Sequence, residues 1–218
     1  MIRTLVYGVL NDSEVHEIKL NVDCEPEIES PPLPRYRPPS IELICKQTKF
    51  TRKEIQIMYR AFKQGCPNGT IGLDQFQDIY IQLFPHGINS KYAEYVFRTF
   101  DSDGDRIISF EEFVNGLSII SRGSVLEKLN WIYTLYDVDR QGVIGHLELM
   151  KISQSMFDLI GNNLGPPVSY QYLLEHASTI VQRMDANKDG VITREEFLDA
   201  CTNDDSICES LDSFDTWF

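Results

Sequence analysis

The sequence predicts an all-α fold in which four helix–loop–helix repeats pair into two lobes, with short β pairings between loops and a helix at the C-terminus. Two observations predict it. Four loops of twelve residues, starting at Gln64, Asp101, Asp137 and Asp185, align as an internal repeat with isoleucine at the eighth position. Apolar residues recur three and four apart before and after each loop, which is the period of an amphipathic helix.

The fourth loop, residues 185–196, places oxygen-bearing side chains at alternate positions, so that they converge on one point. Gly190 permits the sharp bend, and a glutamate at position twelve closes the shell with two oxygens, which suits Ca²⁺. Thr193 and Glu196 also form a capping-box signature, so a helix is expected to begin there. The predicted ligands are Asp185, Asn187, Asp189, the Val191 carbonyl and Glu196.

The second loop carries four carboxylates, the highest charge of the set. Arg106 occupies the position where glycine normally adopts a positive φ, and a side chain there costs about 1–2 kcal/mol, or roughly tenfold in affinity. Gly104, two residues earlier, is expected to relax the bend slightly. We expect Ca²⁺ here, with Mg²⁺ or weak occupancy as the alternative. The predicted ligands are Asp101, Asp103, Asp105, the Ile107 carbonyl and Glu112.

The third loop has a residue at every ligand position, but its ligands are expected to bind more weakly. Gln141 is neutral and one methylene longer than asparagine, while Gly142 supplies the bend. Gly145 lacks the capping hydroxyl that Ser109 and Thr193 supply before the other closing glutamates, so weaker binding than in the fourth loop is expected. The predicted ligands are Asp137, Asp139, Gln141, the Val143 carbonyl and Glu148.

The first loop has no carboxylate at a ligand position and is therefore expected not to bind a divalent ion. Its corresponding residues are Gln64, Cys66, Asn68 and Gln75. The sequence thus predicts two or three Ca²⁺ ions for the chain. A β-branched residue suits a short strand, so Ile71 is expected to pair with Ile108, and Ile144 with Ile192.

The apolar stripes that flank the loops are interpreted as core faces of helices. Thr51 with Glu54 predicts a capping box at the start of the first long helix. The stripe residues are Ile55, Met58, Tyr59, Phe62; Phe76, Ile79, Tyr80, Leu83, Phe84; Tyr92, Tyr95, Val96, Phe100; Phe113, Leu117, Ile120; Leu126, Leu129, Ile132, Tyr133, Tyr136; Leu149, Ile152, Met156, Leu159, Ile160; Leu173, Leu174, Ala177, Ile180, Val181 and Met184.

The organisation divides into residues 1–39, an N-lobe at 40–121 and a C-lobe at 122–218, with the break in helical pattern at 121–124 as the hinge between lobes. Prolines concentrate in residues 25–40 and predict an extended arm, which is either a stiff linker or, at 31–35, a ligand for an SH3 domain. Residues 5–10 fit a short strand or a short helix equally well.

The composition excludes several classes of function. A net charge of −13 argues against nucleic-acid binding and against attraction to an anionic membrane. Five cysteines, with no pair spaced C-x-x-C, favour a reduced, cytoplasmic protein, and no apolar run reaches the roughly 18 residues of a membrane span. The four histidines lack metal-binding spacing, and no nucleophile–base pair or phosphate-binding glycine loop is present, so an enzyme is not expected.

Four short stretches carry a resemblance to a known family: Lys-Phe-Thr-Arg-Lys-Glu at 49–54, Cys-Pro-Asn-Gly at 66–69, Phe-Pro-His-Gly at 84–87 and Glu-Lys-Leu-Asn-Trp at 127–131. Over residues 38–218 the chain resembles the neuronal calcium sensor family of EF-hand proteins, in the branch of potassium-channel-interacting proteins. That resemblance implies an apolar groove across the lobes that binds the N-terminal segment of an A-type voltage-gated potassium channel. It also implies a cytoplasmic protein that reaches the plasma membrane through its channel partner.

The resemblance further implies that the C-terminal helix covers part of the groove. The apolar residues spaced to form that face are Ile207, Leu211, Phe214, Trp217 and Phe218. Ile2 stands where many relatives carry the glycine that is myristoylated, so no myristoyl anchor is expected. Palmitoylation of Cys24 or Cys45 is a weaker alternative. Glu112 stands where the branch often has a shorter aspartate, which keeps Ca²⁺ binding open in the second loop.

Two alternatives to the channel assignment stay open from the sequence. The same groove could regulate a kinase, a cyclase or a phosphatase instead of a channel. A passive Ca²⁺ buffer would carry the same loops but would barely open on binding.

Overall fold

The structure, a computed structural model, describes residues 38–83, 91–160 and 169–203. The predicted proline arm, the strand or helix at residues 5–10 and the apolar face at residues 207–218 lie outside the described residues. The described chain consists of helices joined by short loops, with two small antiparallel strand pairs. The prediction of an all-α fold with β pairings between the loops is therefore confirmed.

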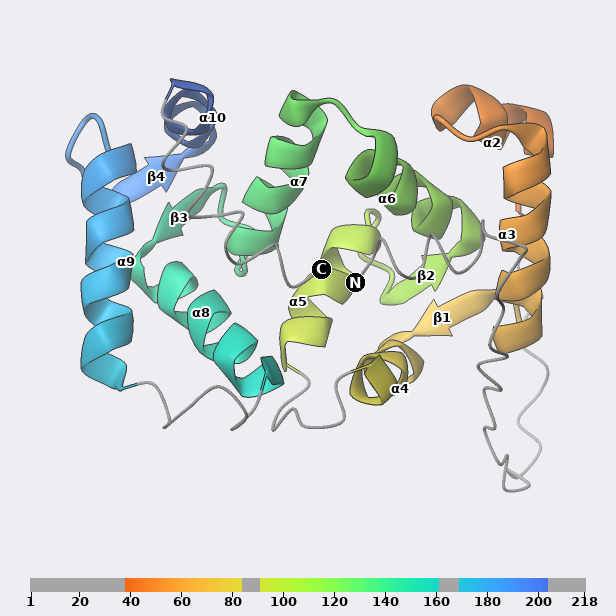
Figure 1. Ribbon diagram of the computed structural model, residues 1–218, viewed down its shortest axis with the longest axis horizontal. Helices are drawn as coiled ribbons and strands as arrows, with labels where there is room; N and C mark the ends of the chain where they lie inside the picture. Colours follow the sequence, from red (N-terminus) through yellow and green to blue (C-terminus); the bar gives the residue numbers. More distant parts are fainter. Residues whose placement is uncertain (1–37, 84–90, 161–168, 204–218) are drawn as a thin grey trace.

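The helices and strands follow the predicted repeat along the chain. The first half contains α2 (Ile41–Gln47), α3 (Arg52–Gly65), β1 (Thr70–Gly72), α4 (Leu73–Leu83), α5 (Lys91–Phe100), β2 (Ile107–Ser109) and α6 (Phe110–Arg122). The second half contains α7 (Val125–Tyr136), β3 (Val143–Gly145), α8 (His146–Ile160), α9 (Tyr170–Met184), β4 (Val191–Thr193) and α10 (Arg194–Asn203). Figure 1 shows one strand pair in each half, with α5 and α7 near the centre of the molecule.

Each strand pair joins two successive loops through the predicted isoleucines. Ile71 lies opposite Ile108 in the pair β1–β2, and Ile144 lies opposite Ile192 in the pair β3–β4, so both predicted pairings are confirmed. All four isoleucines are buried. A pairing of three residues on each side is short, so these buried side chains supply an apolar contact that backbone hydrogen bonds alone would not.

Helix starts are specified by capping boxes, in which a hydroxyl and a glutamate satisfy each other's backbone N–H groups. The boxes predicted at Thr51–Glu54 and Thr193–Glu196 are both present. Ser109 caps α6 in the same way, and Ser124 with Glu127 caps α7. Each box removes unpaired donors from the first turn, which fixes where the helix begins.

The junction at residues 121–124 is shorter than predicted. Ser121 and Arg122 continue α6, and the helix ends only at its C-cap, Gly123. The Gly123 N–H donates to the Ile119 carbonyl at 2.8 Å. Ser124 already caps α7, so the connection between the two helices is Gly123–Ser124 alone.

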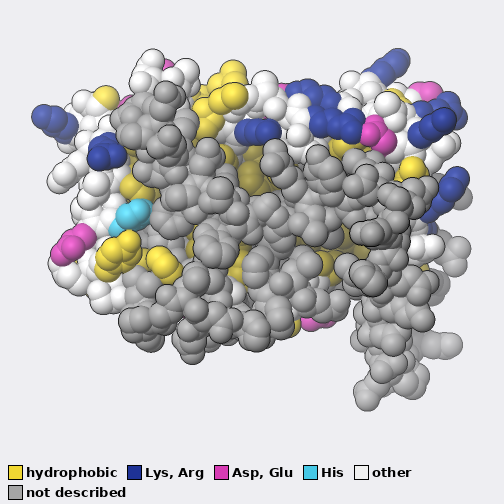
Figure 2. All heavy atoms as spheres, viewed as in Figure 1, with side chains coloured by type: hydrophobic (Ala, Val, Ile, Leu, Met, Phe, Trp, Pro, Cys, Tyr) yellow, Lys and Arg dark blue, Asp and Glu magenta, His cyan; other side chains and the backbone are white. Residues whose placement is uncertain are grey.

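Most members of the predicted apolar stripes are buried or partly buried in one continuous core. Leu126 is an exception, because it is 56% exposed in the first turn of α7, beside Val125 at 70%. Assigning Leu126 to the core was therefore wrong. Helical spacing identifies one face of α7 but does not show that its first turn extends beyond the neighbouring helices. Figure 2 shows hydrophobic side chains exposed at the upper edge of the molecule, over this end of α7.

Polar contacts hold the segment between α2 and α3 against the α6–α7 junction. The Lys49 N–H donates to the Ser118 hydroxyl at 2.8 Å, and the Lys49 ammonium pairs with Glu127. Arg122 pairs with Glu54, and its guanidinium lies 4.6 Å from the centre of the Phe50 ring. The hydrogen bond from Arg122 lowers the pKa of Glu54 to about 2.

The two halves also meet through α5. This helix packs against α4 and α6 of its own half and against α7 and α8 of the other half. Figure 1 shows α5 between these partners. None of the described helices is long and apolar enough to span a bilayer.

Gly116 permits α6 to approach α5 closely, which gives a test of this packing. A Cβ at position 116 would lie 2.4 Å from the Phe100 ring, whereas a Cβ at Gly72 would have no neighbour within 4 Å. We expect Gly116→Ala to lower the free energy of unfolding by about 1–3 kcal/mol because the core is overpacked. Gly72→Ala should change it by less than about 0.5 kcal/mol. Urea unfolding at one fixed free Ca²⁺ concentration measures both, and equal effects would contradict the close approach.

Candidate metal centres

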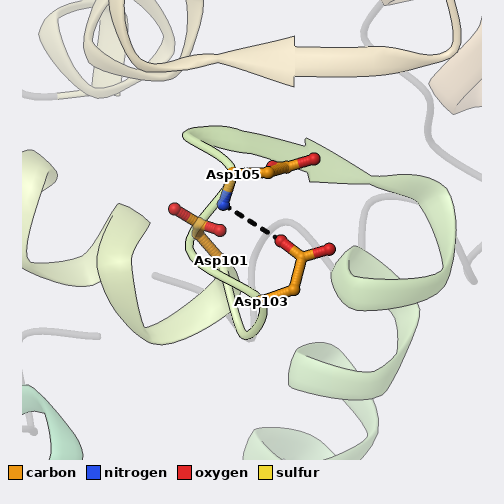
Figure 3. A group of neighbouring side chains, drawn as sticks. All are labelled: Asp101, Asp103 and Asp105. Carbon is orange, nitrogen blue, oxygen red and sulfur yellow. Dashed lines mark hydrogen bonds between the residues drawn. The ribbon is translucent and has the colours of Figure 1, made fainter.

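The second loop brings its first three predicted ligands together. The carboxylate oxygens of Asp101, Asp103 and Asp105 lie within 4.8 Å of one another (Figure 3). The turn is held by backbone donors: the Gly104 N–H donates to Asp101 Oδ1 at 2.8 Å, and the Asp105 N–H donates to Asp103 Oδ1 at 3.1 Å. Burial, together with the neighbouring carboxylates, raises the pKa of Asp105. Three such carboxylates repel one another, and a bound cation would remove that repulsion.

Glu112 connects this loop to the helix that follows it. Its Oε1 accepts from the Ser102 N–H at 2.9 Å, near the start of the loop. Its Oε2 accepts from the Ser109 N–H and hydroxyl, both at 2.9 Å, at the start of α6. The predicted closing ligand is therefore already folded across the loop. Together with Asp101, Asp103, Asp105 and the Ile107 carbonyl, it would complete an all-oxygen donor set of the kind that a hard divalent cation prefers.

Backbone strain in the binding loops is distributed differently from the prediction. Arg106 does adopt the left-handed conformation, with φ at 69°, while Gly104 adopts φ at 77°. The other loops use the same two positions but reverse the order of glycine and side chain: Arg140 (53°) and Gly142 (77°), then Lys188 (60°) and Gly190 (90°). Each binding loop thus holds one strained non-glycine residue. The backbone strain predicted at Arg106 is present, but the third and fourth loops each carry a comparable strained residue.

In the fourth loop, backbone N–H groups hold the side chains of the predicted ligands. Asp185 accepts from the Asp189 and Gly190 N–H groups at 3.2 and 2.8 Å, and Asn187 Oδ1 accepts from the Asp189 N–H at 2.8 Å. Glu196 Oε1 accepts from the Asn187 N–H at 3.2 Å, and its Oε2 accepts from the Thr193 N–H at 2.9 Å. The hydrogen bonds from Thr193 lower the pKa of Glu196. The carboxylate is therefore ionised and placed to close the shell.

The third loop differs because a lysine forms ion pairs with two of its predicted ligands. The Lys151 ammonium lies 2.8 Å from Asp139 Oδ2 and 3.8 Å from Glu148 Oε1. This pairing raises the pKa of Lys151 and lowers that of Asp139. The corresponding positions, three residues after the closing glutamate, hold Asn115 in the second loop and Asp199 in the fourth. The ammonium therefore competes with a cation for one oxygen of Asp139.

The closing residue of the third loop also has less support, as predicted. Glu148 Oε2 accepts from the Gly145 N–H at 3.0 Å, but glycine supplies no hydroxyl there. The start of the loop is ordered by Asp137, which accepts from the Gln141 and Gly142 N–H groups at 2.9 and 2.8 Å. Lys151 is a residue that the sequence interpretation missed, although its spacing of three from Glu148 on one helix was a usable signal.

The first loop keeps the shape without the ligands. The Gln75 amide, which replaces the closing glutamate, donates to the Gly65 carbonyl at 2.9 Å. Cys66 is buried, and its burial raises the pKa of the thiol. Gly69 adopts φ at 86°, and β1 still pairs with β2. The Gln75 amide and the buried Cys66 side chain thus stand at positions where the other loops have cation ligands, and neither needs a cation to balance a negative charge.

Comparison with known families supports the interpretation of these loops. Residues 67–117 match an EF-hand domain pair, and residues 126–202 match a second EF-hand domain pair. The chain is an EF-hand protein. The two matches span the loops on either side of each strand pair, and EF-hands of this kind bind Ca²⁺. The ligand assignments within each EF-hand stay predictions, supported by the geometry given above.

Arg106→Gly in the second EF-hand separates backbone strain from charge. We expect tighter Ca²⁺ binding at that loop, by up to about tenfold, because the left-handed conformation is then free of Cβ strain. Arg106→Ala removes the same positive charge but keeps the Cβ, so it is the matched control. Calorimetric titration of both variants measures the difference, and equal tightening would attribute the effect to charge alone.

Lys151→Met should tighten Ca²⁺ binding at the third EF-hand by roughly two- to fivefold, the range expected for an exposed ion pair. Asn115→Lys places the same charge at the equivalent position of the second EF-hand, where weaker binding is expected. Titrations at low and high salt should show the Lys151 effect shrinking as salt screens the pair. Unchanged affinity in both variants would contradict the competing role of the ammonium.

Proposed function

We propose that this EF-hand protein is a Ca²⁺ sensor that regulates a target protein through an apolar surface on α7 and its neighbours. We further propose that the target is the N-terminal segment of an A-type voltage-gated potassium channel, as the sequence resemblance implies. The observation that carries the sensor proposal is the position of α7. This helix contacts elements that follow both C-lobe loops, and it also presents exposed apolar residues.

Tyr133 connects α7 to both loops of the C-lobe. Its hydroxyl donates to the Gly142 carbonyl at 2.7 Å, at the bend of the third loop. Its ring packs edge-on against Phe197 at 5.5 Å between ring centres, and Phe197 is the residue after the closing Glu196. Arg194 at the start of α10 also donates to Asn130 of α7 at 2.7 Å. A shift of α10 or of the third loop therefore displaces contacts made by α7.

The force for such a shift comes from the closing glutamates. A bound Ca²⁺ supplies a divalent positive charge that attracts the ligand carboxylates. Glu148 and Glu196 lie in the first turns of α8 and α10, so any movement of these carboxylates carries the helix with them. EF-hand sensors change the angle between helices in this way and expose an apolar surface, whereas buffers barely open.

The exposed face of α7 supplies a suitable contact for an apolar helix. Val125 and Leu126 are exposed in its first turn. These side chains give an apolar helix of a target a surface on which to place its anchor residues.

A fluorescent apolar dye tests the sensor proposal. We expect the dye to brighten when Ca²⁺ is added to the full chain. Glu196→Gln should remove most of that change, because the fourth EF-hand loses a charged oxygen of its closing ligand. The adjacent, exposed Glu195→Gln is the control and should behave like the unaltered protein. A dye signal that does not respond to Ca²⁺ would favour a passive buffer instead.

A channel peptide tests the proposed target. Fluorescence anisotropy of a labelled A-type channel N-terminal peptide should show saturable binding, and a scrambled peptide of the same composition should not bind. Leu126→Asp should weaken the binding, whereas Ile81→Asp, a comparably exposed apolar position on α4, should not. Binding of kinase, cyclase or phosphatase peptides in place of the channel peptide would redirect the assignment.

A further inference from the structure

Two arginines join the second and third EF-hand loops across the boundary between the lobes. Arg98, on α5, donates to the Val138 carbonyl of the third loop at 3.2 Å. Arg140, in the third loop, donates in the opposite direction, to the Arg98 carbonyl at 2.9 Å and to the Asp101 carbonyl at 3.0 Å. We call this reciprocal pair the arginine clasp. Its members line a small cleft with Tyr95, Thr134 and Leu135.

The clasp reaches the first predicted ligand of each loop. The Arg140 N–H donates to the Asp137 carbonyl at 3.1 Å, so the turn that contains Arg140 is held by the first ligand of the third loop. The Arg140 guanidinium then holds the backbone of Asp101, the first ligand of the second loop. Asp101 is only 4% exposed, so water has little access to its carbonyl to replace this donor if the donor moves.

The placement of glycine in the second loop fits the same contact. A Cβ at Gly104 would lie 3.3 Å from Arg140 Nη1, a tight approach. The second loop has its glycine, Gly104, at the position that faces Arg140. Its other residue with positive φ is Arg106, where the other two loops have glycine. The fourth loop has Lys188 at the position equivalent to Arg140, which supplies a matched site for comparison.

We propose that Arg140 is a positioning residue that couples the two lobes, so that filling the third loop increases the Ca²⁺ affinity of the second. Ordering of the third loop around its ligands fixes the turn at Arg140, and the fixed guanidinium holds Asp101 in its ligand position. By thermodynamic reciprocity, filling the second loop tightens the third by the same factor. The inference rests on the proposal that both loops are ion sites.

The test is a Ca²⁺ titration of the full chain followed by nuclear magnetic resonance, with free Ca²⁺ set by a chelator. The amides of Gly104 and Gly142 donate to ligands in the second and third loops, so they report each site separately. We expect Glu148→Gln to raise the free Ca²⁺ at which Gly104 responds by about fivefold or more, a typical coupling between sites. In an Arg140→Met background the same change should move the Gly104 response by less than twofold.

The matched control is Lys188→Met, which removes a cation from the equivalent position of the fourth loop and should leave the fivefold coupling intact. Arg140→Lys keeps the charge but donates to fewer carbonyls, so partial coupling is expected if Arg140→Met does not fold. Equal Glu148→Gln effects with and without Arg140 would overturn the proposal, as would no coupling in the unaltered protein. Failure of Gly104 or Gly142 to respond to Ca²⁺ at all would instead refute the underlying site assignment.

Discussion

A single carboxylate both closes each complete loop and begins the helix after it. In the second EF-hand, Glu112 accepts from Ser102 in the loop with one oxygen and from Ser109 at the helix start with the other. Glu196 does the same between Asn187 and Thr193. Loop and helix therefore cannot move independently, because the carboxylate that would bind an ion is part of the first helical turn. The transmission of loop geometry to helix packing follows from this constraint.

The first loop, which has no carboxylate at a ligand position, supports its partner loop. Ile71 of the first loop lies opposite Ile108 of the second, and both are buried. The strand pair requires the bend and the isoleucine of the first loop but none of its ligands, so the ligands could be lost without loss of the pair. The first loop thus holds the second in shape, while the third and fourth loops support each other through Ile144 and Ile192.

The features that the sequence predicted are those set by short spacings. Ligand order, capping boxes and the isoleucine pairs depend on residues within twelve positions of one another or on a repeat. The described part of the chain has the helices that flank the four loops and both strand pairs in place. The arginine clasp joins residues about 40 positions apart, and no local pattern distinguishes Arg140 from Lys188. Exposure of Leu126 was missed for a related reason: periodicity identifies a helix face but not where its neighbours end. The strain balance between Gly104 and Arg106 needed the backbone angles of all three loops.

Tyr133 connects the third and fourth loops. Its hydroxyl donates to the third loop and its ring packs against the helix after the fourth, so a change at this position would disturb both loops together. Lys151 instead pairs with Asp139 and Glu148, within the third loop and the helix after it. Under the proposed coupling, a change at Lys151 would reach the second loop through Arg140, whereas a change at Tyr133 would reach the helix after the fourth loop directly. The third loop would then be the one through which a single substitution adjusts the response of its neighbours on both sides.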